Sequence, residues 1–115
     1  KFLANSNVAG YNQYNRSSLH MFCRAYNWDW NKIKKAIENG TFPLCNTDCS
    51  AYFAVCVNLA YGKEKLPSDC TTRNLVPRCV VTNKANFKLI NHCPPKKWQK
   101  GDAPIKEGKH IIINV

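Results

Sequence analysis

The sequence is poor in acidic residues and lacks the long apolar run that a membrane-spanning helix requires. Only seven Asp and Glu residues stand against 17 Lys and Arg residues among 115, which gives a formal charge of +10. No apolar run approaches the roughly 20 residues of a membrane span. No window has the pattern of a signal peptide and the first residue is Lys1, so we expect a processed or trimmed product. A hydrophobic content of 44% argues against intrinsic disorder, and the length predicts a single domain, residues 1–115, with a small core.

Several patterns that would identify an enzyme are also missing. There is no glycine-rich phosphate loop, and no second cysteine pair or nearby histidine completes a zinc site at Cys45 and Cys49. We therefore expect no metal and no cofactor. A glycosidase needs two converging carboxyl groups, and Asp102 has no evident second member. Cys–His catalysis has no cysteine-centred motif, and crosslinked cysteines cannot act as nucleophiles. These gaps leave the catalytic residues unassigned and favour a binding protein over an enzyme.

Cysteine, in contrast, is abundant. A small core with many cysteines is typical of a secreted domain held by disulfides, each of which contributes about 2–4 kcal/mol. The odd number predicts that at least one thiol is free, intermolecular or paired outside this fragment. The candidates are Cys23, Cys45, Cys49, Cys56, Cys70, Cys79 and Cys93. Two sequons, at Asn15 and Asn39, are candidate glycosylation sites, although such tripeptides are common by chance.

The first half of the chain predicts helices. Residues 17–39 carry one apolar stripe at helical spacing, and Gly40 follows as a stop signal. Asp29 offers a second N-cap, so this stretch is either one helix or two helices broken just before it. Residues 47–61 fit a helix capped by Asp48 but also alternate as a strand does, and a short apolar run cannot be settled by periodicity alone.

The second half predicts β structure. Residues 62–78 carry Gly and Pro and predict a long loop. Residues 79–82 and 87–90 flank a turn and predict a β-hairpin, and residues 110–115 predict a last strand. Taken alone, these elements are compatible with two N-terminal helices packed on a C-terminal antiparallel sheet.

A basic loop precedes the last strand. Lysines around an exposed indole suit an anionic or sugar-bearing ligand, because charge attracts the ligand and a flat aromatic stacks on a ring. The alternative is a solubilising surface loop with the indole tucked into the core. The residues are Lys96, Lys97, Lys100, Lys106 and Lys109 around Trp98.

The three histidines allow a second hypothesis. A basic protein of this size can be a ribonuclease that uses two histidines as acid and base and a lysine for the phosphate. His20, His92 and His110 are the only imidazoles, and no local motif marks this arrangement. Three ordinary histidines are the plainer interpretation.

Six segments occur in an order that suggests a known family: residues 37–40, Cys45 with Cys49, 52–58, 89–95, Asp102, and 108–115. Together they resemble the first domain of expansins and the related barwin-like proteins. The resemblance implies a β-rich α+β fold, stapled by disulfides, built on a six-stranded double-psi β-barrel with one or two short helices. The helices-on-sheet arrangement is the alternative. In this family an Asp lies in the groove, and Asp102 is the positional match, but the preceding His-Phe is absent.

The resulting expectation is a secreted, extracellular, basic module that binds a polysaccharide or an acidic surface without turnover. Its candidate ligand-binding residues are Trp98, Lys96, Lys97, Lys100, Asp102, Tyr11 and Tyr14. One alternative is a secreted ribonuclease or toxin, which would bind nucleic acid. The other is an effector, receptor ligand or protease inhibitor that binds a protein partner, since one scaffold hosts many functions.

Overall fold

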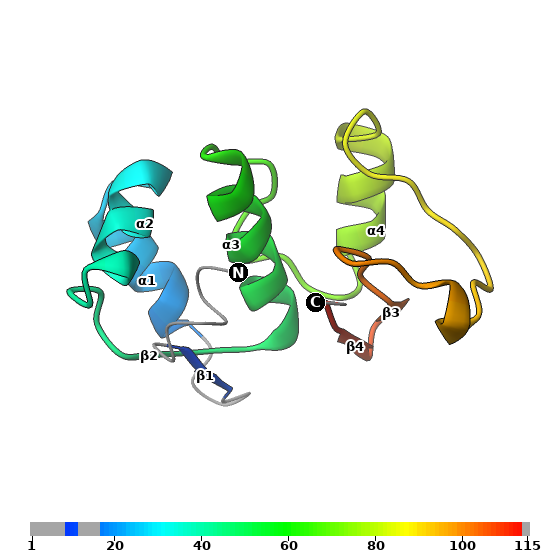
Figure 1. Ribbon diagram of the computed structural model, residues 1–115, viewed down its shortest axis with the longest axis horizontal. Coiled ribbons are helices and arrows are strands. Elements are labelled where there is room, and N and C mark those ends of the chain that lie inside the picture. The colour runs from blue at the N-terminus through cyan, green and yellow to red at the C-terminus, as the bar shows by residue number, and fades with distance from the viewer. Residues whose placement is uncertain (1–8, 12–16, 114–115) are drawn as a thin grey trace.

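The computed structural model describes residues 9–11 and 17–113 of the chain. A group of helices occupies one side, and a short helix, a long loop and a small hairpin occupy the other (Figure 1). In chain order the elements are β1 Ala9–Tyr11, α1 Ser18–Ala25, α2 Trp30–Glu38, β2 Cys45–Thr47, α3 Cys49–Tyr61, α4 Leu75–Pro77, the π-helical turn η1 Arg78–Thr82, the 3-10 turn η2 Pro95–Lys97, β3 Ile105–Lys106 and β4 His110–Ile111.

Helices α1 and α2 divide the apolar stripe of the first half. Asn27 and Trp28 have positive φ values of 54° and 58°, which no α-helix contains. Asp29 then starts α2 by accepting a hydrogen bond on Oδ1 from the Lys32 N–H at 3.1 Å. The predicted second cap is therefore confirmed, and the stretch is two helices.

Helix α3 lies at the centre of the molecule and resolves the ambiguity of residues 47–61. Asp48 caps its start, and Gly62 ends it with a left-handed φ of 70° that glycine adopts without strain. The helix is buried around most of its circumference, so it has apolar residues on several faces and no clear 3.6-residue stripe. Tertiary packing on both sides explains why periodicity alone could not identify it.

Two hydrophobic cores flank α3. The first core joins α3 to α1 and α2 through Leu19, Ile33 and Val55, with seven further buried residues. The second core joins α3 to α4 and β4 through Phe53 and Ile111, with five more. Helix α3 contributes side chains to both cores, so it is the element that unites the molecule.

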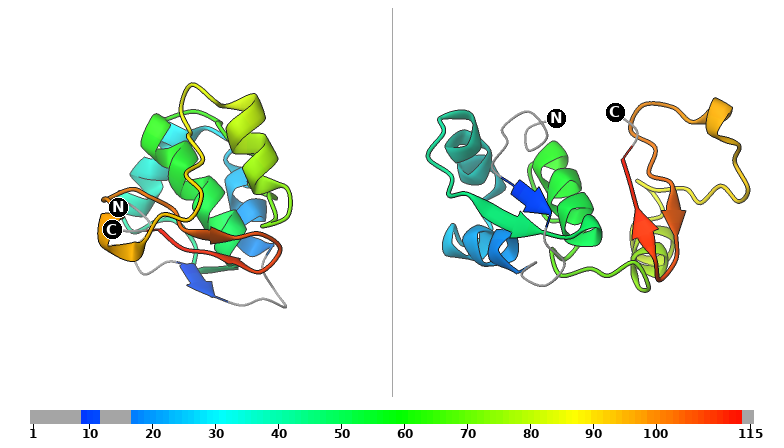
Figure 2. Two further views of the ribbon diagram at one scale, coloured as in Figure 1. Left: turned by 90° about the vertical axis from the view of Figure 1, so that its right-hand side faces the viewer. Right: turned by 90° about the horizontal axis from the view of Figure 1, so that it is seen from below.

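The prediction of a double-psi barrel is wrong. Within the described ranges, β1 pairs in parallel with β2, and β3 pairs antiparallel with β4, so there are two two-stranded sheets and no closed barrel (Figure 2). The predicted hairpin of residues 79–82 and 87–90 is also wrong, because the first segment belongs to the helical turn η1 and the second is loop. The fold is a small α+β domain, partly compatible with the helices-on-sheet alternative.

Disulfide stapling is also contradicted. All seven cysteines lie in the described ranges, and none of them is joined to another by a disulfide. Cys23 and Cys45 pack in the first core, and Cys70 and Cys79 pack in the second, where they act as small apolar side chains. Without crosslinks the expectation of a secreted domain has lost the observation on which it rested.

Two remaining expectations concern the glycosylation sequons and membrane-spanning helices. The sequon residue Asn39 is exposed at the C-cap of α2, and Asn15 lies outside the described residues. No helix of residues 9–11 and 17–113 is long and apolar enough to cross a membrane.

Candidate active site

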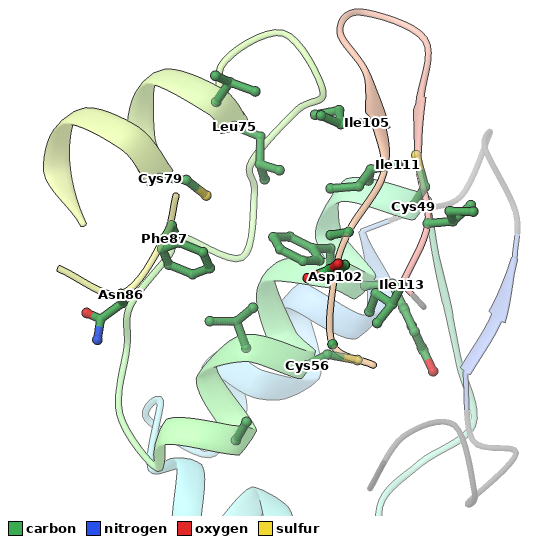
Figure 3. Close-up of a pocket in the computed structure, with 18 of the residues that line it drawn as sticks. Cys49, Cys56, Leu75, Cys79, Asn86, Phe87, Asp102, Ile105, Ile111 and Ile113 are labelled. Atoms are coloured by element: carbon green, nitrogen blue, oxygen red, sulfur yellow. The ribbon is translucent and has the colours of Figure 1, made fainter. Parts of the chain in front are cut away.

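One face of α3 forms the wall of a cavity of about 930 Å³. Cys49, Tyr52, Phe53 and Cys56 recur at helical spacing along this face. The opposite walls come from α4, η1, the following loop and the β3–β4 hairpin. Figure 3 shows Leu75, Cys79, Phe87, Asp102, Ile105, Ile111 and Ile113 around the space. The cavity is therefore largely apolar, with thiols and a few polar groups on its walls.

Cys49 is the first residue of α3 and lies at the end of the cavity that the hairpin approaches (Figure 3). Asp48 Oδ1 caps the helix by accepting from the Ala51 N–H at 3.0 Å. Cys49 is therefore held at the first position of the helix, directly after the capping residue. The Cys49 side chain is partly exposed and packs against the second core, so its sulfur is accessible from the cavity.

A second thiol lies two turns further along the same face. The Tyr52 hydroxyl donates a hydrogen bond to the sulfur of Cys56. Burial raises the pKa of Cys56 to about 11, and burial together with the neighbouring thiol raises the pKa of Tyr52 to about 12. Both groups are therefore neutral near pH 7, and Cys56 is a poor nucleophile there.

The histidines lie in three different environments. Nδ1 of His20 is hydrogen-bonded to the buried Ser68 hydroxyl, and its ring packs on Trp28 at a centroid distance of 5.0 Å. His92 lines a second, smaller cavity and has a positive φ of 57°. His110 begins β4, which contacts α3, and precedes Ile111 of the second core. Its ring is exposed and does not line the large cavity. The structure does not bring the three imidazoles together.

The predicted ligand-binding residues are only partly brought together. Lys100 and Asp102 line the large cavity, and Asp102 also lines the smaller one with Trp98. The Trp98 indole is half-buried, and its Nε1–H donates to the Cys93 carbonyl at 3.1 Å. Lys96 and Lys97 are exposed on η2 and line neither cavity.

Three further predictions concern the two tyrosines, Asp102 and a metal site. Tyr11 lies in β1, far along the chain from Trp98, and Tyr14 lies outside the described residues. Asp102 accepts the Gln99 N–H on Oδ2 at 2.7 Å, so its carboxylate closes a turn. Among the described residues no cluster of three or more His, Cys, Asp and Glu side chains could hold a metal ion.

Comparison with known families identifies the family of this chain, which the geometry alone does not give. The family model described as an endolysin-like domain matches residues 1–115. The chain belongs to this family. No curated protein and no solved structure matches it. The resemblance to expansins and barwin-like proteins is therefore wrong, because the cysteine-anchored segments on which it rested occur here in an endolysin-like domain.

Sequence reasoning missed Cys49 as a candidate nucleophile of this endolysin-like domain. It assigned the cysteines to crosslinks, and a crosslinked sulfur cannot attack a substrate. The available signal was a cysteine directly after Asp48, the expected N-cap, because such a cysteine stands at the first position of a helix.

Proposed function

We propose that this endolysin-like domain is a cysteine-dependent hydrolase of an amide bond in the bacterial cell wall. The observation that carries the proposal is Cys49, a free and partly exposed thiol at the N-terminus of a core helix, on the wall of a large cavity. The family supports the substrate class, because endolysins are enzymes that open the peptidoglycan of a cell wall.

In the proposed reaction, Cys49 Sγ attacks the carbonyl carbon of the amide and forms a C–S bond. His110 accepts the thiol proton and returns it to the leaving nitrogen as the C–N bond breaks. Water then attacks the thioester, which releases a carboxylic acid and restores the thiol. A helix leaves its first N–H groups without intrahelical partners, so those of Cys49 and Ser50 can stabilise the oxyanion.

His110 is the proposed base because its strand contacts α3 beside Cys49. Its ring is exposed and outside the cavity lining, so the proposal rests on the position of its strand. Catalytic hydrogen bonds often tighten only in the substrate complex. His20, in contrast, is already engaged by Ser68 and Trp28.

A glycosidase is less well supported by the same cavity. Asp48 and Asp102 both line it, and glycoside hydrolysis needs a pair of carboxyl groups. However, Asp48 is buried and caps α3, and Asp102 closes its own turn. Neither carboxylate is free to act as an acid in the cavity.

The test is hydrolysis of purified peptidoglycan sacculi, with release of amino groups and of reducing sugars measured separately. We expect amino groups to be released by the wild-type protein and by Cys93→Ala, but not by Cys49→Ala. Cys93 is the matched control because it is also partly exposed and lies outside the large cavity. Full activity of Cys49→Ala contradicts the proposal, and release of reducing sugars alone assigns the cavity to glycan cleavage.

A second comparison tests the base. We expect His110→Ala to lose most of the cleavage, whereas His92→Ala retains it, because only His110 lies on a strand that contacts α3. If His92→Ala is inactive and His110→Ala is not, the assignment of the base is wrong. Retention on sacculi without any cleavage supports instead the binding module expected from the sequence.

A further inference from the structure

Half of the net positive charge of the chain is concentrated in one segment. Residues 83–109 contain seven lysines and two carboxylates, which gives this segment a formal charge of +5 out of the total of +10. The seven are Lys84, Lys88, Lys96, Lys97, Lys100, Lys106 and Lys109, and all are exposed. We call residues 83–109 the basic segment.

These lysines are available to an external ligand. In the described part of the chain, no carboxylate lies within ion-pairing distance of any of the seven; the pair Lys32–Asp29 is on α2. The loop between η1 and β3 extends away from the helices as a wide arm (Figures 1 and 2). Several like charges held together without counter-charges repel each other, and a polyanion relieves that repulsion.

The basic segment also borders the proposed active site. The large cavity, which contains Cys49, and the smaller cavity, which contains Trp98, share Lys88, Asp102 and several neighbours. The two cavities therefore adjoin one another on the side of the basic segment. A linear polymer that passes over both cavities would meet lysines along its path.

We propose that the basic segment binds a phosphodiester-containing polymer attached to the cell wall and so holds the peptidoglycan beside Cys49. This inference rests on the proposed cell-wall substrate. Lysine ammonium groups are point charges on flexible stems, so they suit phosphates repeated along a chain without fixed geometry. Arginine is absent from the segment, so no planar, bidentate site for a single carboxylate is formed.

Binding is measured with the Cys49→Ala protein, so that turnover does not remove the ligand. The probes are Gram-positive sacculi that retain their phosphodiester polymers and the same sacculi stripped by hydrofluoric acid, which keep their peptide carboxylates. We expect retention on intact sacculi to be roughly tenfold greater than on stripped sacculi. Retention should fall at 1 M salt, where the Debye length is only about 3 Å. Equal retention on both overturns the proposal, as does stronger retention by vesicles of anionic lipid.

Charge-reversal variants show which surface binds the polymer. Lys84→Glu, Lys96→Glu and Lys97→Glu, at three exposed positions that line neither cavity, together should abolish the preference for intact sacculi. The matched control reverses the exposed Lys32, Lys35 and Lys63, changes the net charge equally and should retain the preference. The milder change of the same three loop lysines to Gln should give an intermediate loss even if the reversal variant is poorly folded. Equal loss in both reversal variants shows that only the net charge matters and overturns the assignment.

The two proposals fail separately. With Cys49 intact, the loop variants should cleave stripped sacculi at the wild-type rate. If they do so but show no defect on intact sacculi, the basic segment does not bind the polymer, while the hydrolase proposal stands.

Discussion

At the scale of single residues, Cys49 differs from the thiols of the two cores. Burial raises the pKa of Cys23 to about 12, and those of Cys45, Cys56 and Cys70 to about 11. These four sulfurs are therefore protonated at pH 8 and react slowly, because the thiolate is the nucleophile. We predict that iodoacetamide at pH 8 alkylates Cys49 well before these four, as measured by peptide mass spectrometry over time.

Cys93 provides the comparison for that experiment. It is also partly exposed but lies in a loop without a helix N-terminus. Because both thiols are partly exposed, Cys93 should also react before the four buried thiols and so sets the rate of an accessible thiol. Labelling of Cys56 or Cys70 as fast as Cys49 would show that the cavity face of α3 is not arranged as described.

Asn58 holds the loop after α3 in place. It is fully buried, its Oδ1 accepts the N–H groups of Lys65 and Leu66 at 2.7 and 3.0 Å, and its Nδ2 donates to the Leu66 carbonyl at 2.7 Å. Asn58→Ala leaves buried backbone groups without partners, so we predict a loss of about 2–4 kcal/mol in the free energy of unfolding. Urea denaturation measures it, with the exposed Asn91→Ala as control. A loss below that of the control contradicts the described network.

At the scale of elements, the N-caps of α2 and α3 allow a matched comparison. Asp29→Ala and Asp48→Ala each remove a side-chain cap, so each should cost about 1 kcal/mol of stability in urea denaturation. Only Asp48 orders the turn that presents Cys49. We therefore predict that Asp48→Ala slows alkylation of Cys49, whereas Asp29→Ala leaves the rate unchanged. An equal effect of both variants would mean that the cap does not position the thiol.

Local chemistry made the first two helices predictable. The break at Asp29 follows from a capping carboxylate, which acts through neighbouring backbone and is visible in sequence. Helix α3 was not decidable, because its burial on two sides removes the stripe that periodicity detects. The segment containing Val80 and Val81 has β-branched residues typical of strands, yet tertiary context places it in η1.

The site was less predictable than the helices. Trp98, Lys100 and Asp102 do lie beside cavities, because a loop rich in lysine must stay at the surface. Cys49 was missed, since the number of cysteines suggested crosslinks, and whether cysteines pair depends on how the cores pack. Proximity of β4 to α3 is a long-range contact that no local pattern encodes.

At the scale of the whole molecule, buried thiols take the place of the expected disulfides. Their folded pKa values lie near 11 to 12, against an ordinary value of 9.0. Unfolding lets these groups lose protons at a lower pH. Their contribution to stability is therefore complete below about pH 9 and is lost as the pH rises toward the folded values. We predict that the urea midpoint falls steadily between pH 8.5 and about pH 11.

Two cysteine variants test whether the buried thiols cause this pH dependence. Cys23→Ala should be less stable at pH 7 because it leaves a cavity in the first core, but its stability should fall less steeply with pH. Cys93→Ala should keep the wild-type slope. A wild-type midpoint that does not change up to pH 11 would contradict the burial of these thiols in the two cores.

The most direct test of the account is to trap the acyl group on the protein during turnover. The wild-type protein is incubated with peptidoglycan fragments, quenched in acid during turnover and analysed by peptide mass spectrometry. We predict that the peptide containing Cys49 gains the mass of the acyl part of the fragment as a thioester, and that hydroxylamine removes it. Amide cleavage by the wild-type protein, with no acyl group on Cys49 in any trapping experiment or with the acyl group on another residue, would contradict the central claim.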